Sequence, residues 1–309
     1  MFGLKYSTRF TTYLKQSNHL LNLFSHISKD ACLVHSRIRN FSSNMGLPLR
    51  DVIKRLQELA PLKLAEGWDN VGLLVEPTSN TIIDTALLTI DLTEDVVEEA
   101  IENKAGLIIS YHPNIFKPLK RVTQSHWKER IISKCIRSDI AVFSPHTSWD
   151  AVENGVNDWL ASAFNLRFSK PIVENSDDPT GKSGVGRIIT MAAPSPLNKI
   201  IEDVKKHIGI PHLRVGLAKH QDMDTIISSI AVCAGSGGSV LNGVKADLYL
   251  TGEMLHHDVL EATQNGINVI LCNHSDSERG YLKNFQQKIQ CQSLKVIVSK
   301  VDRDCLVTV

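Results

Sequence analysis

The sequence lacks any unbroken apolar run approaching the roughly 18 residues that a membrane-spanning helix needs, which argues against an integral membrane protein. It also lacks a charge excess, because 34 Lys and Arg stand against 33 Asp and Glu, a net charge of +1. Direct nucleic-acid binding is therefore not expected. None of the six cysteines forms a CxxC pair, which excludes a zinc ribbon and favours buried free thiols in a reducing compartment.

The small net charge hides a basic N-terminus. Residues 1–44 contain six basic residues and one acid, so this segment carries +5 against −4 for the remainder. It is rich in Ser and Thr, and this composition is typical of a mitochondrial transit peptide. Residues 39–43 resemble a matrix processing site, and Met45 could serve as an internal start that yields a cytoplasmic form. The alternative is an N-terminal extension without a targeting role.

Apolar runs alternate with helical patterns along residues 45–168. The 3.6-residue periodicity at 49–59 predicts an amphipathic helix. Three later runs are predominantly apolar, and a helix-like segment follows each of them: 86–90, 107–110 and 140–144. Strands that are buried on both faces and alternate with helices indicate a parallel α/β sheet. We therefore expect an N-terminal α/β lobe over 45–168.

This alternation is interrupted in the middle of the chain. Residues 169–186 are rich in turn-forming residues and predict a linker, and a small βαβ-like piece follows it up to residue 225. The α/β alternation then returns over 226–309. The expected fold class is α/β, with two lobes that flank a linker and small insert at 169–225.

Chemically useful side chains follow five of the apolar runs, at the point where each run ends. They are Asp91, His112, His146 with Asp150, Glu253, and His274 with Glu278. Open α/β sheets place their sites at the carboxyl ends of strands. We therefore expect these side chains to converge at one site.

Two of these groups have the spacing of a helical turn. His146 and Asp150, like His274 and Glu278, are four residues apart, so each pair would share one helix face. One such pair alone is more often a satisfied polar pair at a helix start. Two pairs together with His112 favour a divalent metal site, and imidazole plus carboxylate suits Zn, Fe, Ni or Mn.

Other features leave alternatives open. The run Gly235-Ser236-Gly237-Gly238 follows a strand and opens a helix, so it could cradle an anion or form a tight turn with close helix packing. His256 and His257 open a helix, and one of them could face the site while the other lies at the surface.

At these residues the sequence closely resembles the Nif-three-like family (NGG-interacting factor three), whose bacterial members are known as GTP cyclohydrolase type-two homologs. The matching stretches lie between residues 46 and 282: Trp68-Asp69-Asn70-Val71-Gly72-Leu73-Leu74, Ser110-Tyr111-His112-Pro113, Ser144-Pro145-His146-Thr147 with Asp150, Thr251-Gly252-Glu253 with His256-His257-Asp258, and His274 with Glu278. The resemblance implies two similar α/β lobes and a toroidal homo-hexamer with metal sites inside.

The resemblance also implies a dinuclear site. Its ligands would be His112, Asp150, His274 and Glu278, with one ion held by His112, Asp150 and Glu278. The second ion would be held by His274 and a shared Glu278. Bacterial relatives have a histidine at the position of Tyr111, and Tyr is a poor neutral ligand. One tight and one weaker divalent site are therefore expected.

Three functions are compatible with these residues. The first is a metal-dependent hydrolase acting on a nucleotide-like substrate, with Glu253, Asp91, His146 or His256 as general base. The cyclohydrolase reaction itself is suggested by family analogy alone. The second is a non-enzymatic partner of transcriptional regulators, because eukaryotic members of the family are described as interacting with them. The third is a metal-handling factor.

Overall fold

The computed structural model describes residues 46–78 and 81–309. Residues Met45–Val309 form one compact unit, and the rest of this section concerns that unit. The predicted mitochondrial presequence at 1–44 and the internal start at Met45 lie outside the described residues. Within the described ranges, no helix combines the length and apolarity needed to cross a membrane.

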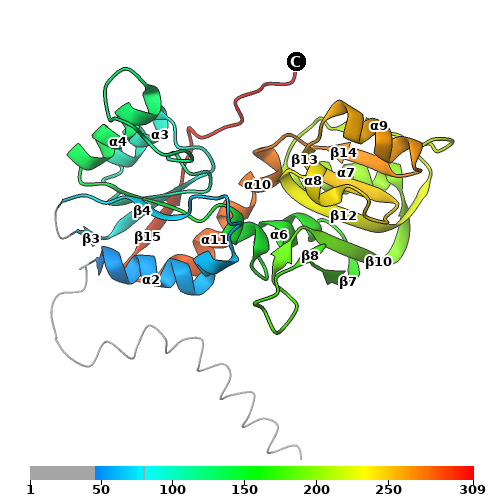
Figure 1. Ribbon diagram of the computed structural model, residues 1–309, viewed down its shortest axis with the longest axis horizontal. Coiled ribbons are helices and arrows are strands. Elements are labelled where there is room, and N and C mark those ends of the chain that lie inside the picture. The colour runs from blue at the N-terminus through cyan, green and yellow to red at the C-terminus, as the bar shows by residue number, and fades with distance from the viewer. Residues whose placement is uncertain (1–45, 79–80) are drawn as a thin grey trace, which may run out of the picture. The chain divides into compact units, whose positions relative to one another are not determined.

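The first sheet has five strands in the order β15-β4-β5-β6-β2 (Figure 1). Their bounds are Lys295–Val298, Thr85–Thr89, Leu107–Ser110, Ala141–Ser144 and Gly72–Val75. The first four run parallel, and β2 pairs antiparallel with β6 at one edge. The central strands β4, β5 and β6 are buried throughout, which explains why their sequences are predominantly apolar rather than alternating between apolar and polar residues.

Helices cover both faces of this sheet. Helices α3 (Glu94–Glu102) and α4 (Trp127–Arg137) pack on the face that carries Leu87 and Ile108. On the opposite face, α2 (Leu49–Leu59) and α11 (Tyr281–Ile289) pack on the side of Ala86 and Leu88. Figure 1 shows the two helix pairs on either side of the strands. The α/β fold predicted from the sequence is confirmed in this layered arrangement.

The second sheet has six strands in the order β11-β14-β13-β12-β10-β7. Their bounds are Arg214–Gly216, Asn268–Leu271, Leu248–Glu253, Ile226–Ser236, Arg187–Pro196 and Leu166–Lys170. The three strands β12, β13 and β14 are parallel, β10 and β11 pair antiparallel with β12 and β14, and β7 pairs antiparallel with β10. Helix α7 (Leu197–Ile208) packs on one face of this sheet, and α8 (Gly238–Leu241) and α9 (His256–Gln264) pack on the other.

The strands cross the segment boundaries that the sequence suggested. The segment 169–225 contributes β10 and β11 to the same sheet as the strands after residue 225, and β15 returns from the C-terminal segment to pair with β4. Short strand pairs complete the fold: β1 (Leu47–Pro48) with β3 (Ile82–Ile83), and β8 (Val173–Glu174) with β9 (Gly184–Val185). The division at residues 168 and 225 stays a prediction about the sequence.

The two sheets share one hydrophobic core. A single buried cluster contains Leu88 of the first sheet and Val232 of the second, together with Trp159 between them. Trp159 lies on α6 (Val156–Ala161), which packs against β12 and against α11. This shared core fixes the carboxyl ends of strands from both sheets relative to each other, and so positions the residues described next.

Candidate metal centre

Strand ends from both sheets supply the residues of the site. Asp91 and His112 follow β4 and β5 of the first sheet, and His146 follows β6 just before α5 (Thr147–Ala151). Glu253 ends β13 of the second sheet. His274 follows β14, and Glu278 lies on α10 (Asp276–Arg279).

Two imidazoles face one buried carboxylate at the centre of the site. Nε2 of His112 lies 3.5 Å from Oε2 of Glu278, and Nε2 of His274 lies 3.4 Å from its Oε1. The side chain of Glu278 is only 2% exposed. The ligand atoms of these three residues lie within 4.8 Å of one another, so this group could hold a metal ion.

The other ring nitrogen of each imidazole, Nδ1, contacts a second carboxylate. Nδ1 of His112 lies 2.9 Å from Oδ1 of Asp91, and Nδ1 of His274 lies 2.9 Å from Oε1 of Glu253. These contacts place a proton on Nδ1 and leave the Nε2 lone pair directed at the centre. Histidine ligands of metals are commonly oriented in this way by a carboxylate on the other ring nitrogen.

The electrostatics of the centre fit a cation. Burial, followed by the negative charges of Asp150 and Asp91, raises the pKa of Glu278 well above its ordinary value. Its Oε2 is buried without a hydrogen-bond partner in the described part of the chain. Burial also lowers the pKa of His112, which favours the neutral ring that a metal ligand requires. A divalent ion between these groups would compensate the buried carboxylate.

Space for an ion is provided by a glycine. Gly235 has φ +64°, and a Cβ atom there would lie 2.6 Å from Oε1 of Glu278 and 3.2 Å from Nε2 of His274. Its amide donates to Oγ of Ser277 at 2.8 Å, and the amide of Gly237 donates to Oγ1 of Thr251 at 3.0 Å. Because these amides are already bonded, the glycine run favours the tight-turn interpretation over an anion cradle.

A third histidine–carboxylate pair lies beside the centre. Nδ1 of His146 is 2.7 Å from Oδ1 of Asp69, and the His146 and His112 rings are 5.4 Å apart. The other oxygen of Asp69 accepts hydrogen bonds from the Thr147 amide and hydroxyl. Burial tends to raise the pKa of Asp69, but these hydrogen bonds hold it below its ordinary value. His146 has φ +33°, a strained backbone conformation of the kind that clusters at functional sites.

The sequence did not predict the pairing of Asp69 with His146, because Asp69 stood out there only as part of a stretch that resembles the family. Its partner is 77 residues away, so no local pattern could connect the two. The sequence also suggested Asp91 and Glu253 as general bases. In the structure both carboxylates face imidazole nitrogens, and their catalytic role stays a prediction.

Asp150 and Tyr111 form a pair next to the three central residues. The Tyr111 hydroxyl donates to Oδ1 of Asp150 at 2.5 Å. Burial is the largest cause that raises the pKa of Asp150 to about 6. The structure groups both imidazoles, His112 and His274, around Glu278, whereas Asp150 lies outside that group. Its role as a ligand therefore stays a prediction.

A pocket of about 280 Å³ opens over the centre. It is lined by Asp91, His112, Glu253 and His274, by Arg214 of β11, and by residues 304–306 near the C-terminus. His256, the remaining candidate base, is exposed at the start of α9 and lines a separate cavity of about 160 Å³. The structure thus brings together every predicted site residue except His256.

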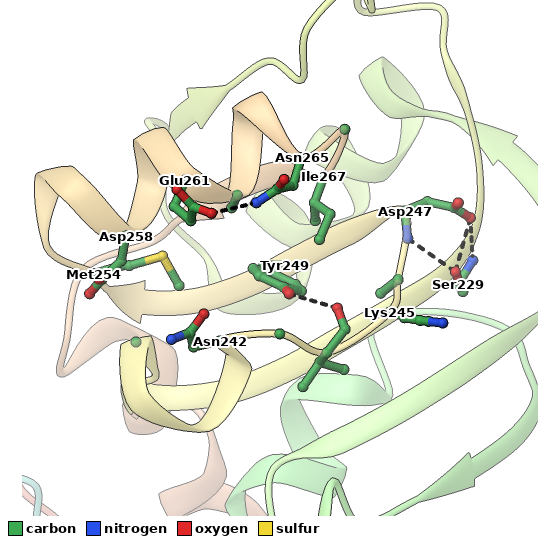
Figure 2. A pocket seen from close by; sticks show the side chains of 16 residues that line it. Ser229, Asn242, Lys245, Asp247, Tyr249, Met254, Asp258, Glu261, Asn265 and Ile267 are labelled. Atoms are coloured by element: carbon green, nitrogen blue, oxygen red, sulfur yellow. Dashed lines mark hydrogen bonds between the residues drawn. The ribbon is translucent and has the colours of Figure 1, made fainter.

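A larger cavity of about 630 Å³ lies on the second sheet, between the residues after α8 and helix α9 (Figure 2). Tyr249 lies within it and donates its hydroxyl to the Val244 carbonyl at 2.6 Å, and Glu261 accepts from the Asn265 amide. Met254 lines both this cavity and the pocket over the centre. The histidines of the metal centre do not line the larger cavity.

Comparison with known proteins identifies relatives along most of the chain. Residues 47–305 match the Duf34/NIF3 (NGG1p interacting factor 3) family. NIF3-like protein 1 of Drosophila melanogaster is 49% identical over 276 residues, which cover 88% of this chain and 93% of the relative. NGG1-interacting factor 3 of Saccharomyces cerevisiae is 35% identical over 277 residues, which cover 84% of this chain and 96% of the relative.

A solved structure supports the same assignment at the level of the fold. The Bacillus cereus protein related to NIF3 has a TM-score of 0.76 and 21% sequence identity, over 87% of this chain and 100% of its own. The family match over residues 47–305 and the sequence relatives show that the chain belongs to the Duf34/NIF3 (NGG1p interacting factor 3) family.

Proposed function

We propose that this protein is a divalent-metal-dependent hydrolase that acts on a nucleotide-like substrate. The supporting observation is the pair of imidazoles, His112 and His274, that are oriented by outer carboxylates toward buried Glu278. When bound there, a divalent ion would supply Lewis acidity. Two nitrogen ligands and one carboxylate suit Zn, Fe, Mn or Ni.

His146 is the best placed of the candidate general bases. Its Nδ1 is engaged by Asp69, which leaves Nε2 to accept a proton, and Asp69 would stabilise the imidazolium that forms. Asp91 and Glu253 instead serve mainly to orient His112 and His274. Among the described residues, exposed His256 is shown in contact only with the ring of His257.

We further propose one tight metal site and a second, weaker one. The tight site in this proposal is formed by His112, His274 and Glu278, whose ligand atoms lie together. This differs from the expectation based on the resemblance, which assigned Asp150 to the tight site and His274 to the second ion. Asp150 would contribute to the second, and its hydrogen bond from Tyr111 competes with metal coordination. This competition, together with the absence of an imidazole at position 111, explains the expected difference in affinity.

The proposal is tested by metal content and turnover. Metal per chain is measured in protein purified without added metal, for the wild type and for His112→Ala, His274→Ala and Glu278→Ala. We expect Glu278→Ala to lose the metal entirely and each histidine variant to lose most of it. His256→Ala, which removes an exposed histidine outside the centre, is the matched control and should keep wild-type content. Full metal retention in Glu278→Ala would rule out this centre.

Turnover is then measured on a panel of nucleotides, with and without a chelator. Metal-dependent hydrolysis by the wild type that is lost in His146→Ala, at unchanged metal content, would support the proposed chemistry. Tight metal binding without turnover of any nucleotide would contradict the hydrolase.

A non-enzymatic role is the second candidate, and one observation favours it. The yeast relative bears the name NGG1-interacting factor 3, which indicates a protein partner for that relative. We propose that this chain can also bind transcriptional regulators, with metal handling as a further possibility. Retention of partner binding in Glu278→Ala would separate this role from the metal centre.

We also propose a homo-hexameric ring and a mitochondrial address, both based on the sequence and its resemblance. Light scattering that shows a stable monomer at micromolar concentration would contradict the ring. For the address, Lys5→Glu combined with Arg9→Glu should abolish mitochondrial import of a C-terminally tagged chain. Translation from Met45 should leave the protein in the cytoplasm.

A further inference from the structure

Residues near the C-terminus contact the chain neighbours of several site residues. After β15, the Ser299 amide donates to the Leu88 carbonyl of β4 at 2.8 Å, and the chain then continues toward α10. Residues 304–306 line the pocket over the metal centre. We refer to residues 299–306 as the C-terminal strap.

Asp302 is the buried anchor of this strap. Its side chain is 2% exposed, and it forms an ion pair with Nη1 of Arg279. Its Oδ2 accepts a hydrogen bond from the Ile90 amide at 2.7 Å. Ile90 immediately precedes Asp91, and Arg279 immediately follows Glu278. One carboxylate therefore joins the strand end that orients His112 to the helix that carries the central glutamate.

A second connection reaches the other histidine. Oγ of Ser275 donates to Oδ2 of Asp304 at 2.7 Å, and Nη2 of Arg279 donates to the same Oγ at 2.9 Å. Ser275 immediately follows His274. The strap therefore contacts the chain neighbours of three site residues, which come from two different sheets.

From these contacts we infer that Asp302 is a positioning residue for the metal centre. It holds the end of β4, which carries Asp91, against helix α10, which carries Glu278. This inference rests on the proposed metal binding. A buried ion pair is costly to break, because the remaining partner is left buried without compensation. Without Asp302, the Arg279 guanidinium would be free to move toward other acceptors, and α10 would lose its link to β4.

The charge of Arg279 supports this arrangement. Arg279 immediately follows the buried Glu278 in the chain, and its guanidinium is held by Asp302 and by the Ser275 hydroxyl. Asp302 holds this charge in place. Loss of the anchor is thus expected to act on metal affinity as well as on stability.

The test is a Zn²⁺ titration of the full chain after removal of bound metal, for the wild type and for Asp302→Asn. We expect Asp302→Asn to bind Zn²⁺ about 10–100-fold more weakly, the range typical of changes just outside the ligand shell. Asp302→Glu keeps the charge and should recover part of that loss. Arg303→Ala changes an exposed neighbour within the strap and should bind as the wild type does.

The possible outcomes separate the two proposals. A wild type that binds no metal would overturn both the proposed function and this inference. A wild type that binds tightly, with equal binding by Asp302→Asn, would overturn the inference alone. All titrations are made well below the melting temperature of each metal-free variant, so that affinity is measured on folded protein. If Asp302→Asn loses stability but keeps its Zn²⁺ affinity, the role of Asp302 is purely structural and the inference is refuted.

Discussion

The metal-free protein should gain stability when one carboxylate beside the centre is neutralised. Asp150 lies close enough to Glu278 for their charges to raise the pKa of Glu278, and burial raises the pKa of Asp150 itself from 3.8 to about 6. The substitution Asp150→Asn removes this charge. It keeps an acceptor oxygen for the Tyr111 hydroxyl, so the packing of the site is retained.

The magnitude follows from the pKa of Asp150. A change from 3.8 to about 6, at about 1.4 kcal/mol per pKa unit, corresponds to a cost of about 3 kcal/mol at neutral pH. Because the residue as a whole is only half-buried, we expect a gain on the order of 1–3 kcal/mol for Asp150→Asn. If Asp150 also serves as a ligand of the second ion, the same substitution should weaken metal binding.

The contribution of Asp150 to folding stability should fall as the pH rises, whereas the contribution of a salt-bridged acid rises with pH. Because the folded pKa is raised, the folded state binds more protons than the unfolded state between about pH 4 and pH 6. The stability that this group contributes is present below pH 4 and is lost as pH rises through about 6. The advantage of Asp150→Asn should therefore be absent near pH 4, grow through this window and level off at neutral pH.

The assay is urea denaturation of chelator-treated wild type and Asp150→Asn at pH 4, 5, 6 and 7. Tyr111→Phe is the matched control, because it removes the hydrogen bond and keeps the charge. It should destabilise the protein by about 1 kcal/mol at neutral pH. A variant that is less stable than the wild type at pH 7, or a difference that does not change with pH, would refute the electrostatic reasoning.

Three further substitutions test other parts of the site. Gly235→Ala should abolish metal binding, because its Cβ would occupy the space between the ligands, whereas Gly243→Ala, with a similar φ and no atom within 4 Å of the added Cβ, should bind normally; equal binding by both would disprove the steric argument. Asp69→Asn should lower kcat about 100-fold or more without changing metal content. An unchanged kcat would show that His146, which Asp69 orients, is not the general base. Tyr111→His should raise metal stoichiometry in plasma emission analysis, and an unchanged value would show that the missing imidazole does not weaken the second site.

The sequence was sufficient to predict that the site lies at strand ends. Asp91, His112 and His274 all follow continuously apolar runs, and such runs are the signature of strands buried on both faces. The convergence of these strand ends follows from the general rule for open parallel sheets. Local pattern and general topology were therefore enough to predict that these side chains lie close together.

The sequence could not predict how these residues are paired. Asp91 and His112 are 21 residues apart, Asp69 and His146 are 77 apart, and Asp302 bonds the Ile90 amide across 212 residues. Such pairings depend on the order of strands within the sheets and on the return of β15 to β4. Asp302 in particular follows no strand-end pattern, because its role arises only when the chain terminus crosses between the two sheets.

The stability of the folded protein should depend on whether this centre holds a cation. Glu278 is buried among other acids, and its Oε2 has no hydrogen-bond partner among the described residues, although a single neutral side chain there would be easier to bury. A bound cation would compensate these charges in the folded state and find no such arrangement in the unfolded chain, so it would stabilise the fold by mass action. Its ligands come from both sheets, with His112 on one side and His274 on the other. The same cation would therefore hold together the two halves that Asp302 joins from behind.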